Sequence, residues 1–457
     1  MRKTYDFSHS RSNPYAERLN VPMTSVITSV PVKLESDSAS QNGMKDANDL
    51  HPGPVLVKSH IPAKTRLQTK GIPKQTDLFG ADEAIMSHES EAFLTEQILT
   101  YIGNKRTLLD FIGKGVQRAM QDLGKERLDI FDVFAGSGIV SRYLKQFSNT
   151  LFTCDLEPYS AIINSCYLSN QSEIDSALIA KAIKTINDAA KKNLRPGFIT
   201  ELYAPQNDQD IKLGERVFYT RRNAMMIDTS RQLIEELLPP EMQRYALAPL
   251  LYVASVHANT SGVFKGFYKN SETGIGQFGG NGKDALTRIC KDFEIPAPLF
   301  SQHECQYRVY QGNSNELAKT IPNIDLAYLD PPYNQHPYGS NYFMLNLIAK
   351  NRRPDETSSV SGIPTDWNRS DYNKRPLAKK ALRELVTSIR AKYLLISFNS
   401  EGFIKHEEMK EMLSEIGTTE SIETQYNTFR GSRNLQDRSI HVKEYLYLVK
   451  KGDSYVK

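Results

Sequence analysis

Four consecutive residues, at positions 330 to 333, could hold and activate an amino group. Asp330, Pro331, Pro332 and Tyr333 directly follow the apolar run 324–329 (IDLAYL). The two prolines stiffen the backbone and remove N–H donors, so this tip offers acceptors, the Asp330 carboxylate and the Pro331 carbonyl. Two acceptors can bind both hydrogens of an exocyclic amino group on a base and direct its lone pair toward an electrophile. The Tyr333 ring offers a face on which that base can stack.

A glycine-containing loop lies upstream, at DVFAGSG (residues 132–138). Its two glycines allow a sharp turn and a close approach of the backbone to a ligand. The helix expected after them adds its amino-terminal dipole. By itself the pattern also fits a plain tight turn. The candidate contacts in this loop are Asp132, Phe134, Ala135, Gly136, Ser137 and Gly138.

Two further stretches could complete a nucleoside site. Asp155 ends the apolar run 151–155, about 20 residues after the glycines, where a carboxylate can accept both hydroxyls of a ribose. It could instead cap the helix expected after Pro158, and Glu157 is a less favoured substitute for the ribose contact. The stretch YIGNK precedes an amphipathic pattern and alone indicates only the start of a helix. Its candidate residues are Tyr101, Gly103 and Lys105.

The elements that must position these residues alternate along the chain. Short apolar runs predict buried parallel strands, and amphipathic stretches at 106–123 and 375–389 predict helices. This order predicts a doubly wound α/β sheet with the candidate residues at the carboxyl ends of its strands. The predicted strands are 128–134, 151–155, 324–329, 392–398 and 444–451.

Composition divides the chain into four parts. Residues 1–90 are rich in Ser, Pro, Asn, Lys and Asp without periodicity, which predicts a disordered polar tail. Residues 91–164 and 306–457 carry the strand–helix alternation and are predicted to form the first and second parts of one domain. Residues 165–305 are predicted to be an insertion, helical at first and glycine-rich later.

Charge and cysteine usage narrow the function classes. The 457 residues carry a net charge of +4, which permits a nucleic-acid partner without requiring one. The four cysteines are scattered without a C-x-x-C pair, which argues against a zinc site or a disulfide framework, so we expect no metal. No run approaches the roughly 18 apolar residues of a membrane span, and no signal peptide is evident. We expect a cytoplasmic protein with no membrane partner.

The polar tail contains a short hydrophobic peptide, QTDLF. It resembles the peptide with which bacterial proteins bind the replication sliding clamp. Leu78 and Phe79 would be the hydrophobic anchors and Gln75 the polar contact. A patch that holds the tail against the folded domain is the alternative. A sliding clamp is therefore a candidate partner.

In combination, the stretches resemble the DNA amino-methyltransferases that use S-adenosylmethionine and modify adenine at N6. YIGNK is similar to their amino-terminal cofactor segment, FAGSG to their glycine loop and DPPY to their catalytic tetrapeptide, over roughly 91–457. The resemblance implies a Rossmann-like methyltransferase sheet, with 165–305 as the target-recognition region. It also implies that residues 330–333 act on a flipped-out adenine of a specific double-stranded DNA sequence, and that Asp330 borders the cofactor as well.

Further stretches agree with the restriction–modification type of this family. This type implies a cognate restriction endonuclease at the functional level. It also implies a bacterial, phage or archaeal host, in which the DNA-bound protein would lie on the nucleoid. The stretches are 217–228, 257–269, 366–374, 398–403, 426–434 and 442–448.

Segments rich in Arg, Lys, Asn and aromatic residues are candidates for reading the DNA sequence, because arginine matches guanine and asparagine matches adenine in the major groove. These segments are 216–223, 257–270, 366–375 and 429–438. In the last one we expect Arg430, Arg433, Asn434 and Arg438 to contact DNA, the alternative being a solvated hairpin. Residues 334–342 are expected to form a mobile segment that closes over DNA.

One position departs from the family pattern. Related adenine methyltransferases often carry an acid on the strand before DPPY, near the adenine or cofactor ring. The matching segment 309–317 (VYQGNSNEL) offers Asn313, whose amide can both donate and accept. The residue that makes this contact is therefore left open, while the reaction class is not affected.

Three other functions remain open from the motifs. Cytosine N4 presents the same kind of amino group as adenine N6, and the adenine of an RNA is a further target. A protein that binds DNA without catalysis is a more remote alternative, because the glycines, Asp155, Asp330 and Tyr333 are all present.

Overall fold

The computed structural model of the protein describes residues 26–27, 89–280, 283, 285–427 and 441–455. Several predictions concern residues outside these ranges. The predicted tail before residue 89 is among them, except for residues 26–27. The predicted clamp contacts Gln75, Leu78 and Phe79 and the predicted DNA contacts Arg430, Arg433, Asn434 and Arg438 lie outside the described residues.

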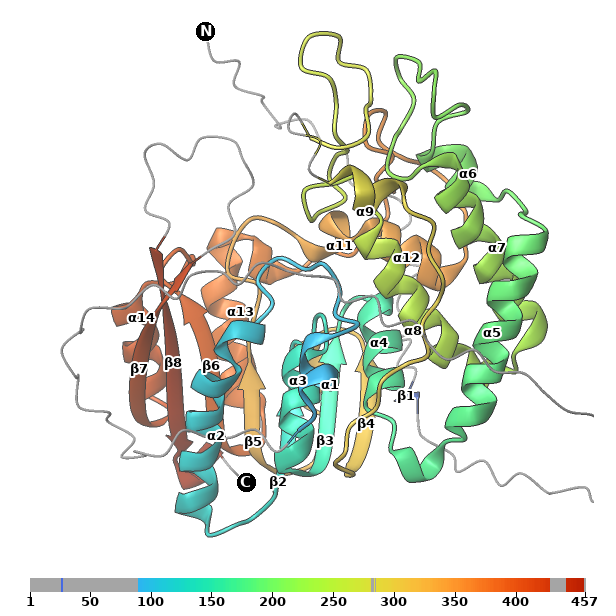
Figure 1. Ribbon diagram of the computed structural model, residues 1–457. Coiled ribbons are helices and arrows are strands. Elements are labelled where there is room, and N and C mark those ends of the chain that lie inside the picture. Colours follow the sequence, from blue (N-terminus) through green and yellow to red (C-terminus); the bar gives the residue numbers. More distant parts are fainter. Residues whose placement is uncertain (1–25, 28–88, 281–282, 284, 428–440, 456–457) are drawn as a thin grey trace, which may run out of the picture.

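The described strands form one sheet with the order β1-β4-β3-β2-β5-β6-β8-β7 (Figure 1). They are β1 (Val26–Ile27), β2 (Leu128–Asp132), β3 (Ser148–Asp155), β4 (Gln306–Gln311), β5 (Ile324–Leu329), β6 (Ala391–Asn399), β7 (Gly417–Asn427) and β8 (His441–Lys451). Strands β4, β3, β2, β5 and β6 are parallel, whereas β8 runs antiparallel between β6 and β7. The strand order switches direction between β2 and β5, the place where open α/β sheets bind ligands.

The apolar runs in the sequence correspond to β2, β3, β5, β6 and β8, so the predicted α/β sheet is confirmed. Strands β1, β4 and β7 were not among the predicted strands, and β1, which pairs with β4, lies within the predicted disordered tail 1–90. Strand β7 has the mostly polar sequence GTTESIETQYN, and among the described strands it pairs with β8 alone, at the edge of the sheet. An edge strand with a polar face lacks the continuous apolar run that marks a buried parallel strand.

Helices cover both faces of the sheet (Figure 1). The helices that flank the strands are α1 (Glu91–Thr95), α2 (Leu109–Leu123), α3 (Ile139–Leu144), α4 (Pro158–Tyr167), α10 (Ser314–Leu317), α11 (Tyr338–Asn341), α12 (Phe343–Lys350), α13 (Arg375–Ser388) and α14 (His406–Ser414). Successive strand residues point to opposite faces. Ile130 and Leu326 pack in one apolar cluster with α2 and α4, and Phe131 and Ala327 pack in a second cluster with α13 and α14.

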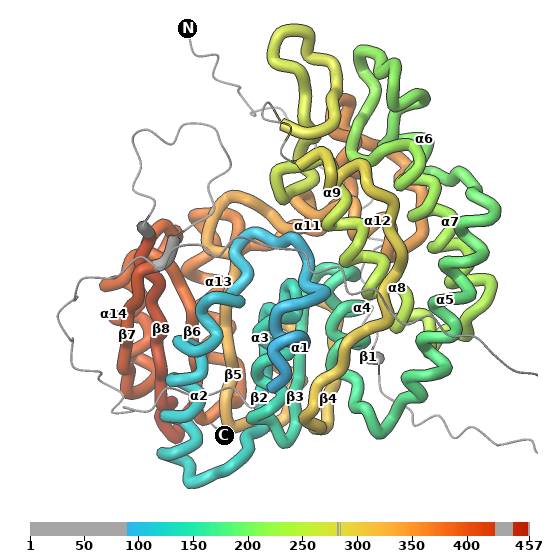
Figure 2. Tube along the Cα trace, viewed as in Figure 1, coloured from blue at the N-terminus to red at the C-terminus, as the bar shows by residue number. Residues whose placement is uncertain are grey.

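The predicted insertion is helical in its first part, as expected. Its helices are α5 (Ser176–Lys192), α6 (Phe198–Tyr203), α7 (Arg221–Leu237), α8 (Pro240–Val256) and the short α9 (Leu286–Cys290). Figure 2 shows this green and yellow part of the chain beside the sheet. Apolar residues of α5, α7 and α8 belong to the same buried cluster as residues of β2 and β5, so the insertion shares its core with the sheet. The exact domain boundaries remain predictions.

Short turns of 3-10 helix complete the described elements. They are η2 (Arg106–Leu108), η3 (Lys145–Phe147), η4 (Gln171–Glu173), η5 (Asp371–Asn373) and η6 (Asp453–Tyr455). Within the described ranges, no helix combines the length and the apolar character needed to cross a membrane.

Candidate active site

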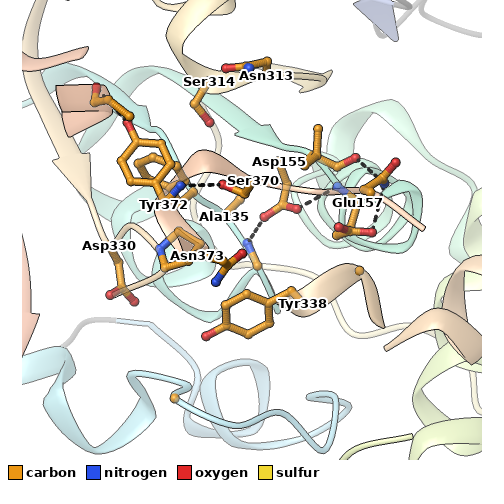
Figure 3. A pocket seen from close by; sticks show the side chains of 18 of the residues that line it. Ala135, Asp155, Glu157, Asn313, Ser314, Asp330, Tyr338, Ser370, Tyr372 and Asn373 are labelled. Carbon is orange, nitrogen blue, oxygen red and sulfur yellow. Dashed lines mark hydrogen bonds between the residues drawn. The ribbon is translucent and has the colours of Figure 1, made fainter. Parts of the chain in front are cut away.

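A cavity of about 330 Å³ lies at the carboxyl edge of the sheet, beside the ends of β2, β3, β4 and β5 (Figure 3). It collects most of the predicted site residues, although they come from stretches far apart in the chain. The predicted residues on its surface are Tyr101, Gly103, Lys105, Phe134, Ala135, Gly136, Ser137, Asp155, Asp330 and Pro332. The glycine loop, the acid after β3 and the DPPY tip therefore border one space.

The glycine loop turns tightly between β2 and α3. Gly136 has a φ of +52°, and a Cβ at this position would lie 3.4 Å from the Tyr101 ring. Its N–H donates to Asp155 Oδ2 at 2.7 Å, and the Glu157 N–H donates to Oδ1 at 2.8 Å. Burial raises the pKa of Asp155 to about 6, although these N–H donors act in the opposite direction. Asp155 thus ties the loop to the end of β3.

Two predicted cofactor contacts, Asp132 and Gly138, do not line the cavity. Asp132 is fully buried, its Oδ2 accepts the Ser141 hydroxyl at 2.5 Å, and burial raises its pKa to about 7. A Cβ at Gly138 would lie 3.0 Å from Asn164 Oδ1. Both residues pack behind the loop, because the last residue of β2 faces α3 rather than the cavity.

The DPPY tip begins immediately after β5. Asp330 and Pro332 line the cavity, whereas Pro331 and Tyr333 lie beside it. The Tyr333 ring packs edge-on against Phe398 of β6, with 5.8 Å between the ring centroids. The tip is therefore anchored to the neighbouring strand, while its carboxylate faces the cavity (Figure 3).

Asp330 pairs with the lysine of the YIGNK stretch. Lys105 Nζ lies 3.0 Å from Asp330 Oδ1 and 3.4 Å from Glu444 Oε1, and Lys105 is only 4% exposed. Burial raises the pKa of Asp330 to about 6; Lys105 lowers this pKa and Glu444 raises it. Burial alone would lower the pKa of Lys105, but the two carboxylates outweigh burial and the pKa is raised. Lys105 is therefore a cation at neutral pH.

Tyrosine rings form one wall of the cavity. The Tyr101 ring lies nearly parallel to Tyr338 and Tyr342, with centroid distances of 5.1 Å and 4.5 Å. The Tyr342 hydroxyl accepts the Ile102 N–H at 2.7 Å. The segment 334–342, for which mobility remains a prediction, forms α11 in its second half, and Tyr342 is fully buried. The stacked rings hold this half against the YIGNK stretch.

The segment 366–373 forms a second wall that the sequence did not reveal. Asn368 Nδ2 donates to Glu157 Oε2 at 3.1 Å, and Asn346 Nδ2 donates to the same oxygen at 2.5 Å. Burial raises the pKa of this Glu157 carboxyl to about 7. The residues of the segment on the cavity surface are Asn368, Ser370, Asp371, Tyr372 and Asn373. We expected this segment to read DNA because it is rich in Arg, Lys, Asn and aromatic residues. Its place in the cavity wall was missed because amides and a tyrosine away from a strand end carry no distinctive cofactor signal.

Asn313 lies on the cavity surface and also caps a helix. Its side chain accepts the Asn315 N–H at 2.9 Å at the start of α10. The Tyr372 hydroxyl donates to Asn315 Oδ1 at 2.8 Å, and the Tyr372 ring packs edge-on against Phe134 at 5.1 Å. Amide and aromatic side chains thus bound this end of the cavity (Figure 3).

Part of another predicted DNA-reading segment is buried. Within 216–223, Val217, Phe218 and Tyr219 are fully buried in the core. Their apolar side chains stabilise the insertion and are not available to base edges. Across the described part of the chain, no group of three or more His, Cys, Asp or Glu side chains is arranged to hold a metal ion.

Comparison with known proteins agrees with this geometry. The family model described as D12 class N6 adenine-specific DNA methyltransferase matches residues 101–412. The chain is 28% identical to type II methyltransferase M.NlaIII of Neisseria lactamica, over 77% of this chain and 99% of that protein. It is 29% identical to type II methyltransferase M.CviAII of Paramecium bursaria Chlorella virus 1, over 76% and 97%.

A third relative is modification methylase StsI of Streptococcus sanguinis, which is 27% identical over 69% of this chain and 46% of that protein. The matched family region begins at Tyr101 and contains the glycine loop, Asp155 and the DPPY tip. The resemblance carried by YIGNK, FAGSG and DPPY is therefore confirmed. The chain belongs to the D12 class of N6 adenine-specific DNA methyltransferases.

Proposed function

We propose that the cavity binds S-adenosylmethionine and that the DPPY tip presents to it the N6 amino group of an adenine flipped out of double-stranded DNA. One observation carries this proposal: Asp330 borders the same cavity as the Gly136 loop and Asp155. A volume of about 330 Å³ suits a small-molecule ligand. Cofactor and target base would then meet at the Asp330 end.

The residues of the cavity fit the proposed cofactor. S-adenosylmethionine supplies an electrophilic methyl group on a sulfonium. At Gly136 the positive φ favours glycine over any residue with a side chain, so the backbone can approach a ligand closely. The Phe134 and Tyr372 rings offer apolar surface for a purine.

Asp155 is the better candidate for the ribose hydroxyls. Oδ2 accepts the Gly136 N–H and Oδ1 accepts the Glu157 N–H, and an ionised carboxylate offers about four acceptor sites in all. Glu157 also borders the cavity, but its Oε2 already accepts from two asparagine side chains. Asn313 uses its oxygen as a helix cap, which leaves its NH₂ group for the ring of the cofactor adenine.

The DPPY tip would orient the target amino group. The nitrogen of this group is a poor nucleophile because its lone pair is delocalised into the ring. Asp330 and the Pro331 carbonyl can accept its two hydrogens and localise that pair, while Lys105 holds one Asp330 oxygen. Orientation of this kind can contribute roughly 7–11 kcal/mol relative to a bimolecular reaction. Stacking on Tyr333 would offset part of the few kcal/mol needed to flip the base.

The names of the relatives suggest a biological setting. Two are named type II methyltransferases and a third a modification methylase. We therefore propose that this protein methylates a specific DNA sequence and protects it from a cognate restriction endonuclease. The DNA contacts at Arg430, Arg433, Asn434 and Arg438 and the sliding-clamp contact remain predictions.

A labelled methyl-transfer assay tests the reaction. The purified protein is incubated with labelled S-adenosylmethionine and with plasmid DNA from a strain without adenine methyltransferases, or with RNA, and the product is hydrolysed to nucleosides. We expect label in N6-methyladenine from duplex DNA. Label in N4-methylcytosine, label only with RNA, or no label would overturn the proposal. Sequencing of methylated bases in an expressing host would then identify the target sequence.

A further inference from the structure

Glu444 is a buried carboxylate beside the site that none of the proposed roles uses. It is 1% exposed and lies near the start of β8, where it pairs in register with Asn399 at the end of β6. Because β8 runs antiparallel to β6, its first residues lie at the carboxyl edge of the parallel strands. This topology brings Glu444 to the edge from which Asp330 extends.

Direct side-chain contacts link Glu444 to Asp330 through one lysine. The Ser397 hydroxyl donates to Glu444 Oε1 at 2.7 Å, and Lys105 Nζ lies 3.4 Å from the same oxygen. On its other side, the ammonium lies 3.0 Å from Asp330 Oδ1. The chain Ser397–Glu444–Lys105–Asp330 thus joins β6, β8, the YIGNK stretch and the end of β5.

The charges of these four linked side chains do not cancel. Lys105 and Asp330 together would be neutral, and Glu444 adds a second negative charge. A buried carboxylate destabilises the folded protein unless its interactions compensate for the loss of hydration. A neutral amide at position 444 could also accept a hydrogen bond from the ammonium. The carboxylate therefore adds a net negative charge beside the cavity.

We infer that Glu444, held by Ser397, is a positioning residue for methyl transfer: it fixes Lys105 against one oxygen of Asp330 and gives the site a net negative charge. This inference rests on the proposed function of the DPPY tip. One Asp330 oxygen is thereby occupied by Lys105, and the other is left for the amino group of the base.

The charge has a use in the reaction. The N6 lone pair forms the new nitrogen–carbon bond while the methyl–sulfur bond breaks and leaves its electron pair on sulfur. Positive charge thus moves from sulfur to nitrogen, and the nitrogen afterwards releases one proton to solvent. A fixed negative charge beside the reacting nitrogen stabilises the positive charge that develops on it.

The same geometry predicts the direction of a pH effect. The titratable groups around the pair are Lys105, Glu444, Asp132, Tyr328, Tyr333 and Tyr338. Burial holds the pKa of Asp330 at about 6, and Glu444 contributes to this rise. Transfer should decline as pH falls through about 6, because Asp330 becomes protonated. Removal of the Glu444 charge should lower the pKa of Asp330 and move this decline to lower pH.

The test compares Glu444→Gln, Ser397→Ala and wild type in single-turnover methyl transfer to plasmid DNA between pH 5 and 8. Glu423→Gln is the matched control, because Glu423 forms an exposed ion pair with Lys443 on the same β-ribbon. We expect Glu444→Gln to slow transfer by up to about 100-fold, because a misplacement of about 1 Å at the reacting groups can cost that much. The pH at which its transfer rate falls to half should be lower, while its calorimetric affinity for S-adenosylmethionine should match that of the wild type. Ser397→Ala should show a smaller loss of transfer rate, and Glu423→Gln should show no loss of transfer rate.

The outcomes separate the inference from the proposed function. Wild-type protein that forms no N6-methyladenine would refute the proposed function itself. With active wild type, an unchanged rate and an unchanged pH of half-maximal rate in Glu444→Gln would overturn the inference, as would a rate loss matched by an equal loss of cofactor affinity. If Glu444→Gln does not fold, Ser397→Ala decides: slower transfer at unchanged cofactor affinity supports the inference, and a wild-type rate overturns it.

Discussion

Asp330 and Asp155 are both buried acids at the ends of parallel strands, but their partners differ. Asp330 pairs with the Lys105 ammonium, whereas Asp155 accepts backbone N–H groups of the glycine loop and of Glu157. The Lys105 ammonium fixes the Asp330 carboxylate, which can then accept an amino group. The loop N–H groups fix the Asp155 carboxylate, which can then form part of a nucleoside site. The two acids should therefore fail in different ways when they are replaced.

Asp330→Ala should abolish methyl transfer, yet its affinity for S-adenosylmethionine should fall less than that of Asp155→Ala. Loss of Asp155 removes both the proposed ribose acceptor and the partner of the Gly136 N–H, whereas Asp330 lies at the end of the cavity. Calorimetric titration with S-adenosylmethionine measures both affinities. Asp188→Ala, on the exposed face of α5, is the control and should match wild type. The reverse order of affinities would refute this division of roles.

At the scale of elements, the cavity depends on a close fit between α11 and the segment 366–373. Gly339 of α11 faces this segment, and a Cβ there would lie 2.4 Å from the Asn368 carbonyl oxygen. Since this obstacle is backbone, neither side can yield by rotating a side chain. The segment is further held by the Glu157 carboxylate, which accepts from Asn368.

Gly339→Ala should destabilise the protein by about 1–3 kcal/mol, the usual cost of overpacking a filled site. It should also weaken S-adenosylmethionine binding, because the displaced segment carries Tyr372 and Asn373 of the cavity wall. Denaturant unfolding and calorimetry measure the two effects. Gly266→Ala is the matched control, since no atom lies within 4 Å of a Cβ there. Equal behaviour of both variants would show that the contact between α11 and the segment does not shape the cavity.

At the scale of the whole molecule, one buried apolar cluster runs from the sheet into the insertion. It contains Ile130 of β2, Leu326 of β5, Ile183 of α5 and Leu250 of α8. Elements that share a core lose their packing together when either part opens. The inserted helices should therefore not form an independently stable unit.

Unfolding should accordingly be a single transition. Trp367 is the only tryptophan in the sequence and lies next to Asn368, so its fluorescence reports on the cavity wall, while far-UV circular dichroism reports on all helices. The two denaturant curves should coincide. A ligand at 100 times its Kd should shift both by about 2.7 kcal/mol, which saturating S-adenosylmethionine tests. Two separate transitions, or a shift in only one curve, would contradict a shared core.

Several features of the site could be predicted because they depend on neighbours in sequence. An apolar run that ends in Asp330 and two prolines predicts a strand tip rich in acceptors, and Gly136 after a strand predicts a tight turn near a ligand. The same local reasoning failed for Asp132. Being the last residue of β2, it could face either side of the sheet, and the structure turns it toward Ser141 of α3.

By itself, then, the sequence determined the α/β class, the acids at the strand ends and the family, because each is recorded in local periodicity or in short motifs. Only the tertiary structure decided which distant side chains meet these motifs. Glu444 reaches Lys105 because β8 runs antiparallel to β6, and Asn368 reaches Glu157 because its segment crosses the cavity. Such contacts follow from strand order and direction, which short stretches of sequence do not encode.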